Sequence, residues 1–225
     1  VVDSGSTDRT REIAREMGAR VIENPWPGYA AQKRFAMEKT QGDWVLNLDA
    51  DERVSLPLRD AIATAITREA VDGYLIRFET SMFGRRVRFG GLGRERHLRL
   101  FRKAKASYPE VCVHEGVVVD GAIAQLEEPI LHDPYASLEE YFEKFNHYTS
   151  QMAIERFKAG RRFSAFSALR WPWGFFRRYV LQLGFLDGYA GFLNASLSGL
   201  YDFVKYAKIH DLERKPAALP PAPEG

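Results

Sequence analysis

The sequence predicts an α/β protein with three layers, a parallel central sheet and a helical region at its C-terminal end. In the first half of the chain, short apolar runs alternate with segments of helical periodicity, and strands joined through helices pair in parallel. One of these runs, residues 44–48, stops at Asp49-Ala50-Asp51-Glu52. A buried parallel strand delivers charged side chains to its carboxyl end in this way, and ligands of open α/β sheets bind at that edge.

The composition is that of an ordinary globular protein, with 225 residues, 45% of them hydrophobic and 28% charged. Such a chain can bury a substantial core and is expected to form one domain with an appendage. The net charge of +2 gives no reason to expect nucleic-acid binding. The charge is uneven, because residues 156–208 contain nine Lys or Arg and two acidic residues. The C-terminal third is therefore the basic part.

The chain opens with two strand–helix units. Residues 1–3 are expected to be a strand, followed by a Gly-containing turn and a helix whose apolar face carries Ile13 and Met17. Residues 20–23 have the pattern of a second strand, and a helix over residues 29–40 leads into the acidic strand end. Because residues 1–3 have the pattern of a strand already in progress, an upstream strand is expected to be missing from this sequence.

The carboxylates at the acidic strand end have the spacing of a metal site. In an extended chain residues i and i+2 point the same way, so Asp49 and Asp51 can converge on one divalent cation, and Ala50 leaves room for a ligand. A cation at this position favours a diphosphate substrate, because it offsets the charge of the phosphates. A strand that ends in a solvated acidic turn is the alternative interpretation.

The middle of the chain is expected to contain a helix with Pro57 near its start and a strand over residues 74–78. The pattern then changes, because residues 80–101 interleave glycines with six arginines, namely Arg85, Arg86, Arg88, Arg94, Arg96 and Arg99. Such a segment can approach and neutralise a polyanion. A solvated loop is the alternative.

Residues 111–119 form another apolar run, with the charged pair His114 and Glu115 at its centre. A carboxylate buried in such a run needs a charged or hydrogen-bonding partner, or has a functional role. In a regular strand the two side chains point to opposite faces. The single cysteine, Cys112, lies in the same run; it excludes an intramolecular disulfide and suits a reducing compartment.

The C-terminal part is predicted to be helical. Ser137 and Glu140 form a capping box that opens a helix towards Lys158, and residues 161–179 are rich in aromatic and basic side chains. Residues 180–206 are apolar but interrupted by polar groups, so an interfacial helical hairpin fits better than a spanning helix. A helical subdomain packed on the main domain is the alternative. The proline-rich tail is expected to be disordered.

Several of these segments together resemble the family 2 glycosyltransferases, which have the GT-A fold of nucleotide-diphospho-sugar transferases. Their order and spacing are similar to the branch of lipopolysaccharide and lipooligosaccharide core β-glucosyltransferases, whose members carry a basic, aromatic C-terminal region. The resemblance extends to about Lys208. The matching segments are VVDSGSTD (residues 1–8), QKRFA (32–36), LDADE (48–52) and VHE (113–115).

The resemblance implies a binding site for a nucleotide-sugar and a metal ion. Asp3 lies beside the base or ribose, Ser4 stands next to it where the commoner motif has a second Asp, and Lys33 is near the nucleotide. Asp49 and Asp51 hold Mg²⁺ or Mn²⁺ on the donor diphosphate, with Asp49 also contacting the nucleotide-sugar. A UDP-sugar is the expected donor.

The resemblance also implies an inverting transfer of a hexose, with glucose expected, to a lipid-linked saccharide such as lipopolysaccharide core. A carboxylate must take the proton of the attacking hydroxyl, and Glu115 is the candidate for this catalytic base. His114 either completes the metal shell, contacts phosphate or hydrogen-bonds in the core. The implied location is cytoplasmic and peripheral, on the inner face of the cytoplasmic membrane, with an anionic membrane surface as a partner.

These expectations divide the chain into a GT-A catalytic domain at residues 1–135, a membrane-interfacial helical region at 136–215 and a disordered tail at 216–225. Two other functions stay open. A sugar nucleotidyltransferase also combines an α/β sheet with a metal on phosphates, and it would consume a sugar-1-phosphate. A non-catalytic, membrane-associated module that binds a sugar or nucleotide would show no metal-dependent hydrolysis of a nucleotide-sugar.

Overall fold

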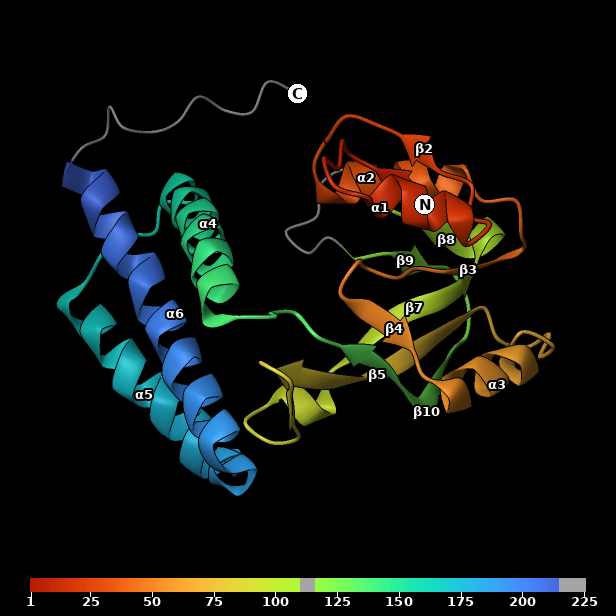
Figure 1. Ribbon diagram of the computed structural model, residues 1–225. Coiled ribbons are helices and arrows are strands. Elements are labelled where there is room, and N and C mark those ends of the chain that lie inside the picture. Colours follow the sequence, from red (N-terminus) through yellow and green to blue (C-terminus); the bar gives the residue numbers. More distant parts are fainter. Residues whose placement is uncertain (110–115, 215–225) are drawn as a thin grey trace.

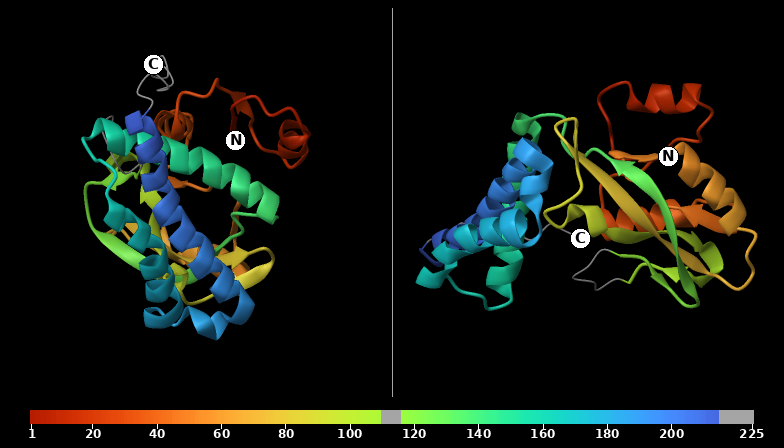
Figure 2. Two further views of the ribbon diagram at one scale, coloured as in Figure 1. Left: turned by 90° about the vertical axis from the view of Figure 1, so that its left-hand side faces the viewer. Right: turned by 90° about the horizontal axis from the view of Figure 1, so that it is seen from below.

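The computed structural model describes residues 1–109 and 116–214, which form two halves (Figure 1). One half contains the strands together with α1, α2 and α3, and the other consists of the helices that follow β10. Figure 2 shows the helical half at one end of the sheet.

The main sheet has the strand order β3-β7-β5-β10-β4, with β6 paired to β5. Its strands are β3 (Trp44–Leu46), β4 (Glu52–Val54), β5 (Gly73–Met82), β6 (Arg85–Val87), β7 (Arg96–Arg102) and β10 (Ile123–His132). Within this described sheet, β5 and β10 pair in parallel and all other pairs are antiparallel. The predicted parallel sheet is therefore wrong. Turns and the short 3₁₀ helix η1 (Leu92–Arg94) join β5, β6 and β7, and strands connected without a crossover helix pair antiparallel.

The main core lies between the sheet and α3 (Leu56–Ala65). The hydroxyl of Ser55 accepts a hydrogen bond from Leu58 N at 3.3 Å, and Pro57 lies in the first turn, where its missing N–H is not needed. The Tyr74 hydroxyl donates to the Ala65 carbonyl at 2.9 Å, so its polar tip is satisfied. This core fixes β5, β7 and β10. Its buried side chains are Leu58, Ala65, Tyr74, Ile76, Phe78, Leu100 and Ile130.

The N-terminal unit is separate from the main sheet. β1 (Val2–Asp3) and β2 (Ile22–Glu23) form a parallel pair of their own, accompanied by α1 (Thr10–Glu16) and α2 (Tyr29–Glu38) (Figure 1). Ile13 and Met17 are 46% and 82% exposed, so the predicted apolar face of α1 is not buried against the described chain. After η2 (Lys103–Lys105), β8 (Ala106–Ser107) and β9 (Val118–Val119) form a second small pair.

The helical half is built on two long helices, α4 (Leu138–Lys158) and α6 (Gly188–Arg214). The Ser137 hydroxyl accepts a hydrogen bond from Glu140 N at 3.1 Å, which is one half of the predicted capping box, whereas the Glu140 carboxylate accepts from Ala136 N at 2.8 Å. Between the long helices lie η3 (Ala165–Leu169), α5 (Arg170–Phe176), the π-helical turn η4 (Arg177–Leu181) and η5 (Gly184–Asp187). None of the helices in the described ranges is sufficiently long and apolar to cross a membrane.

The loop between β6 and η1 fastens the helical half to the sheet. Asp187 Oδ2 accepts hydrogen bonds from Arg88 N and Phe89 N at 2.9 and 2.7 Å. Gly90 N donates to the Gln182 carbonyl at 3.0 Å. Backbone groups of one half are thus paired directly with groups of the other, and the half-buried bond from Phe89 N is the costlier of the two Asp187 bonds to break.

Candidate active site

The turn after β1 is organised by the carboxylate of Asp3, which is 6% exposed. One carboxylate oxygen accepts hydrogen bonds from Gly5 N and Ser6 N at 3.0 and 2.9 Å, and the other accepts one from the Ser6 hydroxyl. These bonds, above all the one from the hydroxyl, lower the pKa of Asp3. Gln32 of α2 donates to Ser4 Oγ at 2.8 Å. Asp3 and Ser4, which are predicted to lie beside the nucleotide, therefore belong to one ordered turn that is hydrogen-bonded to α2.

Asp49 lies between two cations. Its carboxylate oxygens are 3.0 Å from Lys33 Nζ and 2.8 Å from Arg99 Nη2. Arg99 also pairs with one oxygen of Glu52, and the other oxygen accepts a hydrogen bond from Asp49 N at 3.1 Å. Burial alone would raise the pKa of Asp49, but the charges of Arg99 and Lys33 lower it. At Glu52, where the side chain is 2% exposed, burial prevails and raises the pKa.

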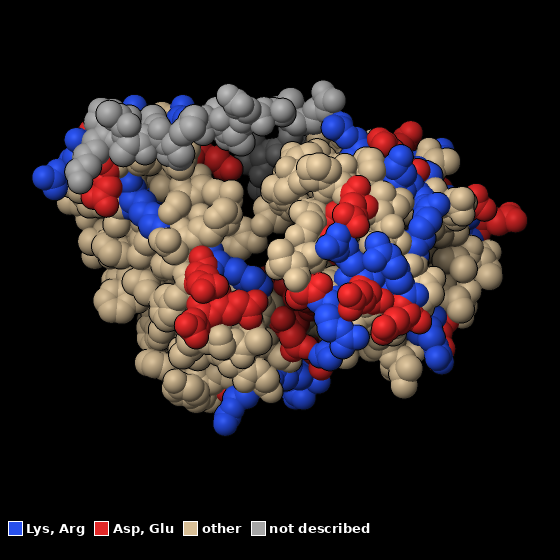
Figure 3. Space-filling model, turned by 45° about the horizontal axis from the view of Figure 1, so that its top comes forward, with Lys and Arg blue, Asp and Glu red and all other residues tan. Residues whose placement is uncertain are grey.

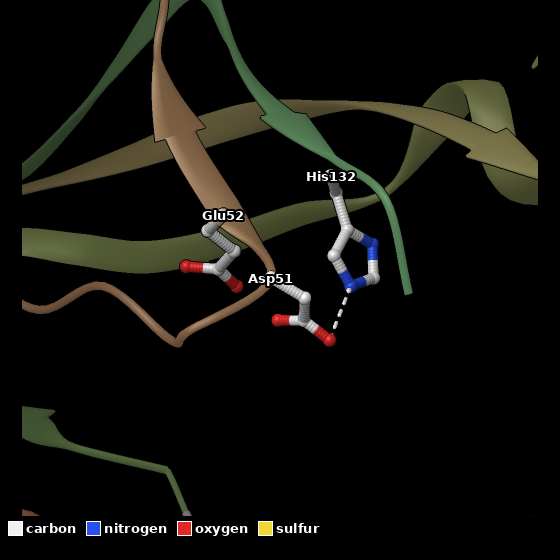
Figure 4. A group of neighbouring side chains, drawn as sticks. All are labelled: Asp51, Glu52 and His132. Carbon is white, nitrogen blue, oxygen red and sulfur yellow. Dashed lines mark ion pairs between the residues drawn. The ribbon is translucent and has the colours of Figure 1, made fainter. Parts of the chain in front are cut away.

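Asp51 and His132 face one another at the side of this network (Figure 4). Asp51 precedes β4, His132 is the last residue of β10, and their Oδ2 and Nε2 atoms are 3.6 Å apart. The contact with His132 lowers the pKa of Asp51. Burial would lower the pKa of His132, but Asp51 raises it above its ordinary value. Asp51, Glu52 and His132 each offer a ligand atom within 4.8 Å of the others.

This donor set fits a hard divalent cation. Carboxylate oxygens are the usual ligands of Mg²⁺ and Mn²⁺, and the imidazole favours Mn²⁺ because Mg²⁺ prefers oxygen ligands almost throughout. Both oxygens of Glu52 already accept hydrogen bonds. Asp51 and His132 are therefore the two members of this described cluster whose ligand atoms can turn to an ion, while Glu52 supplies nearby negative charge.

The structure separates the two aspartates that the sequence predicts to converge. The extended conformation expected for residues 49–51 is wrong, because β3 ends at Leu46 and the chain turns at residues 50 and 51. Asp49 turns to Lys33 and Arg99, and Asp51 turns to His132. Asp49 is paired with both Lys33 and Arg99, and its role as a metal ligand stays a prediction.

Sequence reasoning missed His132 and Arg99 and could not be compared with the structure at two other positions. His132 ends a long strand and is followed by Asp133 and Pro134, a polar strand end similar to the one at Asp49. Arg99 was one of the six arginines assigned to a loop, yet it lies within β7. The predicted catalytic base Glu115 and the predicted metal ligand His114 lie outside the described residues.

Comparisons with known proteins identify the family of this chain. The family model described as "Glycosyl transferase family 2" matches residues 1–113. An uncharacterized glycosyltransferase of Rickettsia typhi (strain ATCC VR-144 / Wilmington) is 33% identical over 232 residues, covering 96% of this chain and 78% of the relative. The chain belongs to glycosyl transferase family 2.

One further relative and one solved structure are also similar to this family 2 glycosyltransferase. The lipopolysaccharide core biosynthesis glycosyltransferase LpsC of Rhizobium meliloti (strain 1021) is 30% identical over 228 residues, covering 96% of this chain and 84% of LpsC. A crystal structure of S. aureus TarS 1-349 aligns with 96% of this chain and 81% of its own, at 15% identity and a TM-score of 0.44. The mixed sheet with its flanking helices is the GT-A-like fold of the family.

The family makes a nucleotide-sugar the natural ligand of the site, and the described charges suit one. Lys33 is a cation on a flexible side chain whose present partner, Asp49, is 37% exposed. A diphosphate that entered here could replace Asp49 as the partner of Lys33, since a phosphate oxygen is at least as good an acceptor for a charged donor.

Beside this group, a cavity of about 280 Å³ lies between the two halves of the glycosyltransferase. His132 contributes to its wall, so the cavity adjoins the candidate metal cluster. Figure 3 shows a hollow between the two halves of the molecule, with acidic side chains on both of its sides.

Proposed function

We propose that this family 2 glycosyltransferase transfers a hexose, with glucose as the first candidate, from a UDP-sugar to a lipid-linked saccharide of the lipopolysaccharide core type, with inversion at the anomeric carbon. The relative LpsC, whose printed name refers to lipopolysaccharide core biosynthesis, supports the class of acceptor. A sugar nucleotidyltransferase and a non-catalytic module lose their support, because the family model and the relatives are those of glycosyltransferases.

The observation that carries the proposal is the side-by-side placement of Asp51, His132 and the Lys33–Asp49 pair. The first two offer ligand atoms to a cation, with Oδ2 and Nε2 3.6 Å apart, and Lys33 offers a positive charge 3.0 Å from Asp49. A nucleoside diphosphate carries negative charges that need both kinds of partner. When bound, Mg²⁺ or Mn²⁺ would offset the charge that develops on the departing diphosphate.

The residues of this chain would then divide the remaining work. Lys33 and Asp49 hold the donor, Asp51 and His132 hold the ion, and the Asp3–Ser4 turn meets the base or ribose. Glu115 takes the proton of the acceptor hydroxyl as this hydroxyl attacks the anomeric carbon. We keep the proposed division into a catalytic domain at residues 1–135 and a helical region at 136–215.

A membrane surface is the proposed location of the lipid-linked acceptor, and the helical half has side chains suited to it. Large apolar side chains are exposed from η3 to the first turns of α6, and Arg161, Arg162, Arg170 and Arg177 lie in or next to this segment. Arginines attract anionic head groups, while aromatic side chains enter the interfacial layer. The exposed side chains are Phe166, Leu169, Trp171, Trp173, Phe176, Val180, Leu181, Leu183, Phe185, Leu186, Tyr189 and Phe192.

The proposed donor and metal requirement are tested by UDP-glucose turnover. The protein is incubated with UDP-glucose with and without Mn²⁺, and release of UDP and glucose is measured before any acceptor is added. Slow, Mn²⁺-dependent hydrolysis that Lys33→Ala weakens is the expected result. A protein that binds neither UDP-glucose nor UDP in the presence of Mn²⁺ would contradict the proposal.

A further inference from the structure

The helical half carries an open groove between η3 and α5, with a volume of about 360 Å³. Three large side chains of this groove are exposed, with Phe166 at 79%, Leu169 at 60% and Trp173 at 57%. In Figure 1, α5 lies on the side of α6 that faces away from the sheet half, so the groove is remote from the candidate metal cluster. The residues that line it are Ser164, Phe166, Ser167, Leu169, Arg170 and Trp173.

Arg170 provides the positive charge of this groove, and an aromatic ring holds its guanidinium group. The Cζ atom lies 4.0 Å from the centroid of the Tyr206 ring of α6. A contact with a ring needs none of the five N–H donors of a guanidinium group. Arg170 makes no hydrogen bond or ion pair with any residue in the described ranges, so these donors are available to a ligand.

The same tyrosine holds a second arginine. Arg156 of α4 donates from Nη1 to the Tyr206 hydroxyl at 2.9 Å, and its Cζ atom lies 5.5 Å from the centroid of the ring. Arg156 likewise forms no ion pair within residues 1–109 and 116–214. Two guanidinium groups therefore meet at one ring without a carboxylate between them.

The surrounding segment supplies no negative charge to offset these arginines. Residues 156–186 contain seven Lys or Arg and no Asp or Glu. Within the described chain, Arg178 is the one of these seven that forms an ion pair, with Asp202 at 3.1 Å. Glu213 comes near η3 from α6, but its carboxylate already accepts a hydrogen bond from Phe163 N at 3.0 Å. The charge of the groove therefore favours an anionic ligand.

The combination of charge and apolar surface fits a phosphate that is attached to a hydrocarbon chain. A guanidinium group binds phosphate through two parallel hydrogen bonds. Free phosphate would leave the exposed apolar side chains in water, whereas an uncharged apolar ligand that covered Arg170 would leave its donors without an acceptor. Phospholipids present both groups together, at the depth where aromatic side chains enter a bilayer. The volume lies within the ordinary range of ligand pockets, about 300–1,000 Å³.

We propose that this groove binds one anionic phospholipid, with the lipid phosphate on Arg170 and the upper part of an acyl chain along Phe166, Leu169 and Trp173. The inference rests on the membrane location proposed above and adds to it a site for a single lipid. General attraction to a surface leaves the orientation of the protein open, whereas a lipid held in a groove fixes it. The bonds of Asp187 to Arg88 N and Phe89 N would pass this orientation on to the sheet half.

A short-chain lipid separates binding in the groove from binding to a surface. The probe is dihexanoyl phosphatidylglycerol below its critical micelle concentration, and its binding to the whole protein is measured by NMR titration of the tryptophan indole N–H signals. Dihexanoyl phosphatidylcholine and inorganic phosphate are titrated for comparison. Vesicles that contain phosphatidylglycerol provide the surface, and calorimetry of UDP with Mn²⁺ shows whether each variant is folded.

Three variants distinguish the site from its surroundings. Arg170→Gln removes the charge at a similar length, and Arg170→Lys keeps the charge but not the forked arrangement of donors. Arg177→Gln is the matched control, because Arg177 is an exposed arginine of the same segment that does not line the groove.

We expect Arg170→Gln to lower the affinity for the short-chain phosphatidylglycerol at least about tenfold and Arg170→Lys at least about threefold, since hydrogen bonds to a charged acceptor are lost. Arg177→Gln should bind this lipid as the parent does, yet bind the vesicles about fivefold more weakly, the loss of one basic side chain near an anionic surface. Inorganic phosphate and the short-chain phosphatidylcholine should each bind at least about tenfold more weakly than the phosphatidylglycerol.

Equal affinity of Arg170→Gln and the parent for the short-chain lipid would overturn the assignment, as would equal losses in Arg170→Gln and Arg177→Gln. Phosphatidylcholine that binds as tightly would reveal an apolar groove without a phosphate site, and inorganic phosphate that binds as tightly would reveal a site for free anions; either result overturns the lipid assignment. A parent that binds UDP with Mn²⁺ but no short-chain lipid overturns this inference alone. A parent that binds the lipid but neither UDP nor UDP-glucose overturns the proposed function alone.

Discussion

Replacing Asp51 by Asn tests whether Asp51 and His132 form the metal site. The substitution keeps the size of the side chain and removes the negative charge, which leaves the His132 imidazole as the remaining available donor of the cluster. Loss of a residue that merely supports a metal ligand lowers metal affinity about 10- to 100-fold. Loss of a charged ligand should therefore lower the affinity for Mn²⁺ at least about 100-fold, which corresponds to about 2.7 kcal/mol.

The same substitution should affect the fold very little. The side chains of Asp51 and His132 are 34% and 25% exposed, and an ion pair with this much contact with water contributes about 0–1 kcal/mol to stability. Thermal unfolding of Asp51→Asn without metal should therefore follow that of the parent. A large drop in metal affinity with an unchanged melting temperature distinguishes a lost ligand from a damaged protein.

Mn²⁺ binding is measured by electron paramagnetic resonance of the free ion, with and without UDP. Asp133→Asn is the matched control, because Asp133 follows His132 directly but its side chain points to Arg53 at the surface. Asp49→Asn should leave Mn²⁺ binding in the absence of UDP close to that of the parent, since Lys33 and Arg99 both pair with Asp49. The reasoning is refuted if Asp51→Asn binds Mn²⁺ within about threefold of the parent.

Three further predictions concern the base, the membrane and the pH dependence of stability. Glu115→Gln should bind UDP normally and lower the rate of transfer about 10²- to 10⁴-fold, as measured by single-turnover kinetics; an unchanged rate would place the base elsewhere. The protein should co-sediment with anionic liposomes in a salt-sensitive manner and do so less when Trp171 and Trp173 are both changed to Ser; equal sedimentation of the two proteins would contradict this. Burial would raise the pKa of Asp202, but Lys205 and Arg178 lower it below 3.8. Its ionised form therefore stabilises the fold above about pH 4, and this contribution is lost as the pH falls through the folded-state pKa. Asp202→Asn should accordingly lose less stability than the parent between about pH 5 and 2 in urea unfolding, and equal losses would argue against the ion pairs.

Local patterns predicted the elements of this chain well where neighbouring residues decide the structure. The cap at Ser137 acts within one helical turn, and α4 begins at Leu138, where the sequence places it. Pro57 lies in the first turn of α3, near the helix start that the sequence predicts. The sheet was predicted less well, because strand direction depends on the connections between strands. Gly84, for example, was interpreted as part of a loop, although it forms the turn between the antiparallel strands β5 and β6.

The arginines of the same segment show a second reason why the site was only partly predictable. Glycine- and arginine-rich sequence is compatible with a segment that binds a polyanion, but three of these arginines form ion pairs within the protein. Arg86 pairs with Glu79, Arg96 with Glu127, and Arg99 with Asp49 and Glu52. Charge type is visible in a sequence, whereas the choice of partner depends on residues up to 50 positions away.

The position of His132 depends on a feature of β10 that apolar–polar alternation alone does not reveal. β5 and β10 pair regularly up to Ile76 and Leu126, and pairing resumes at Phe78 and Ile130. Residues 127–129, including Pro129, therefore stand opposite Arg77 alone, so β10 contains two additional residues. Side chains alternate between the faces of a strand, so a bulge with one additional residue would turn His132 to the other face, whereas two preserve its orientation. The bulge instead moves His132 along the sheet until it pairs with Glu52 of β4, beside Asp51. The candidate metal site thus depends on how many residues the bulge contains.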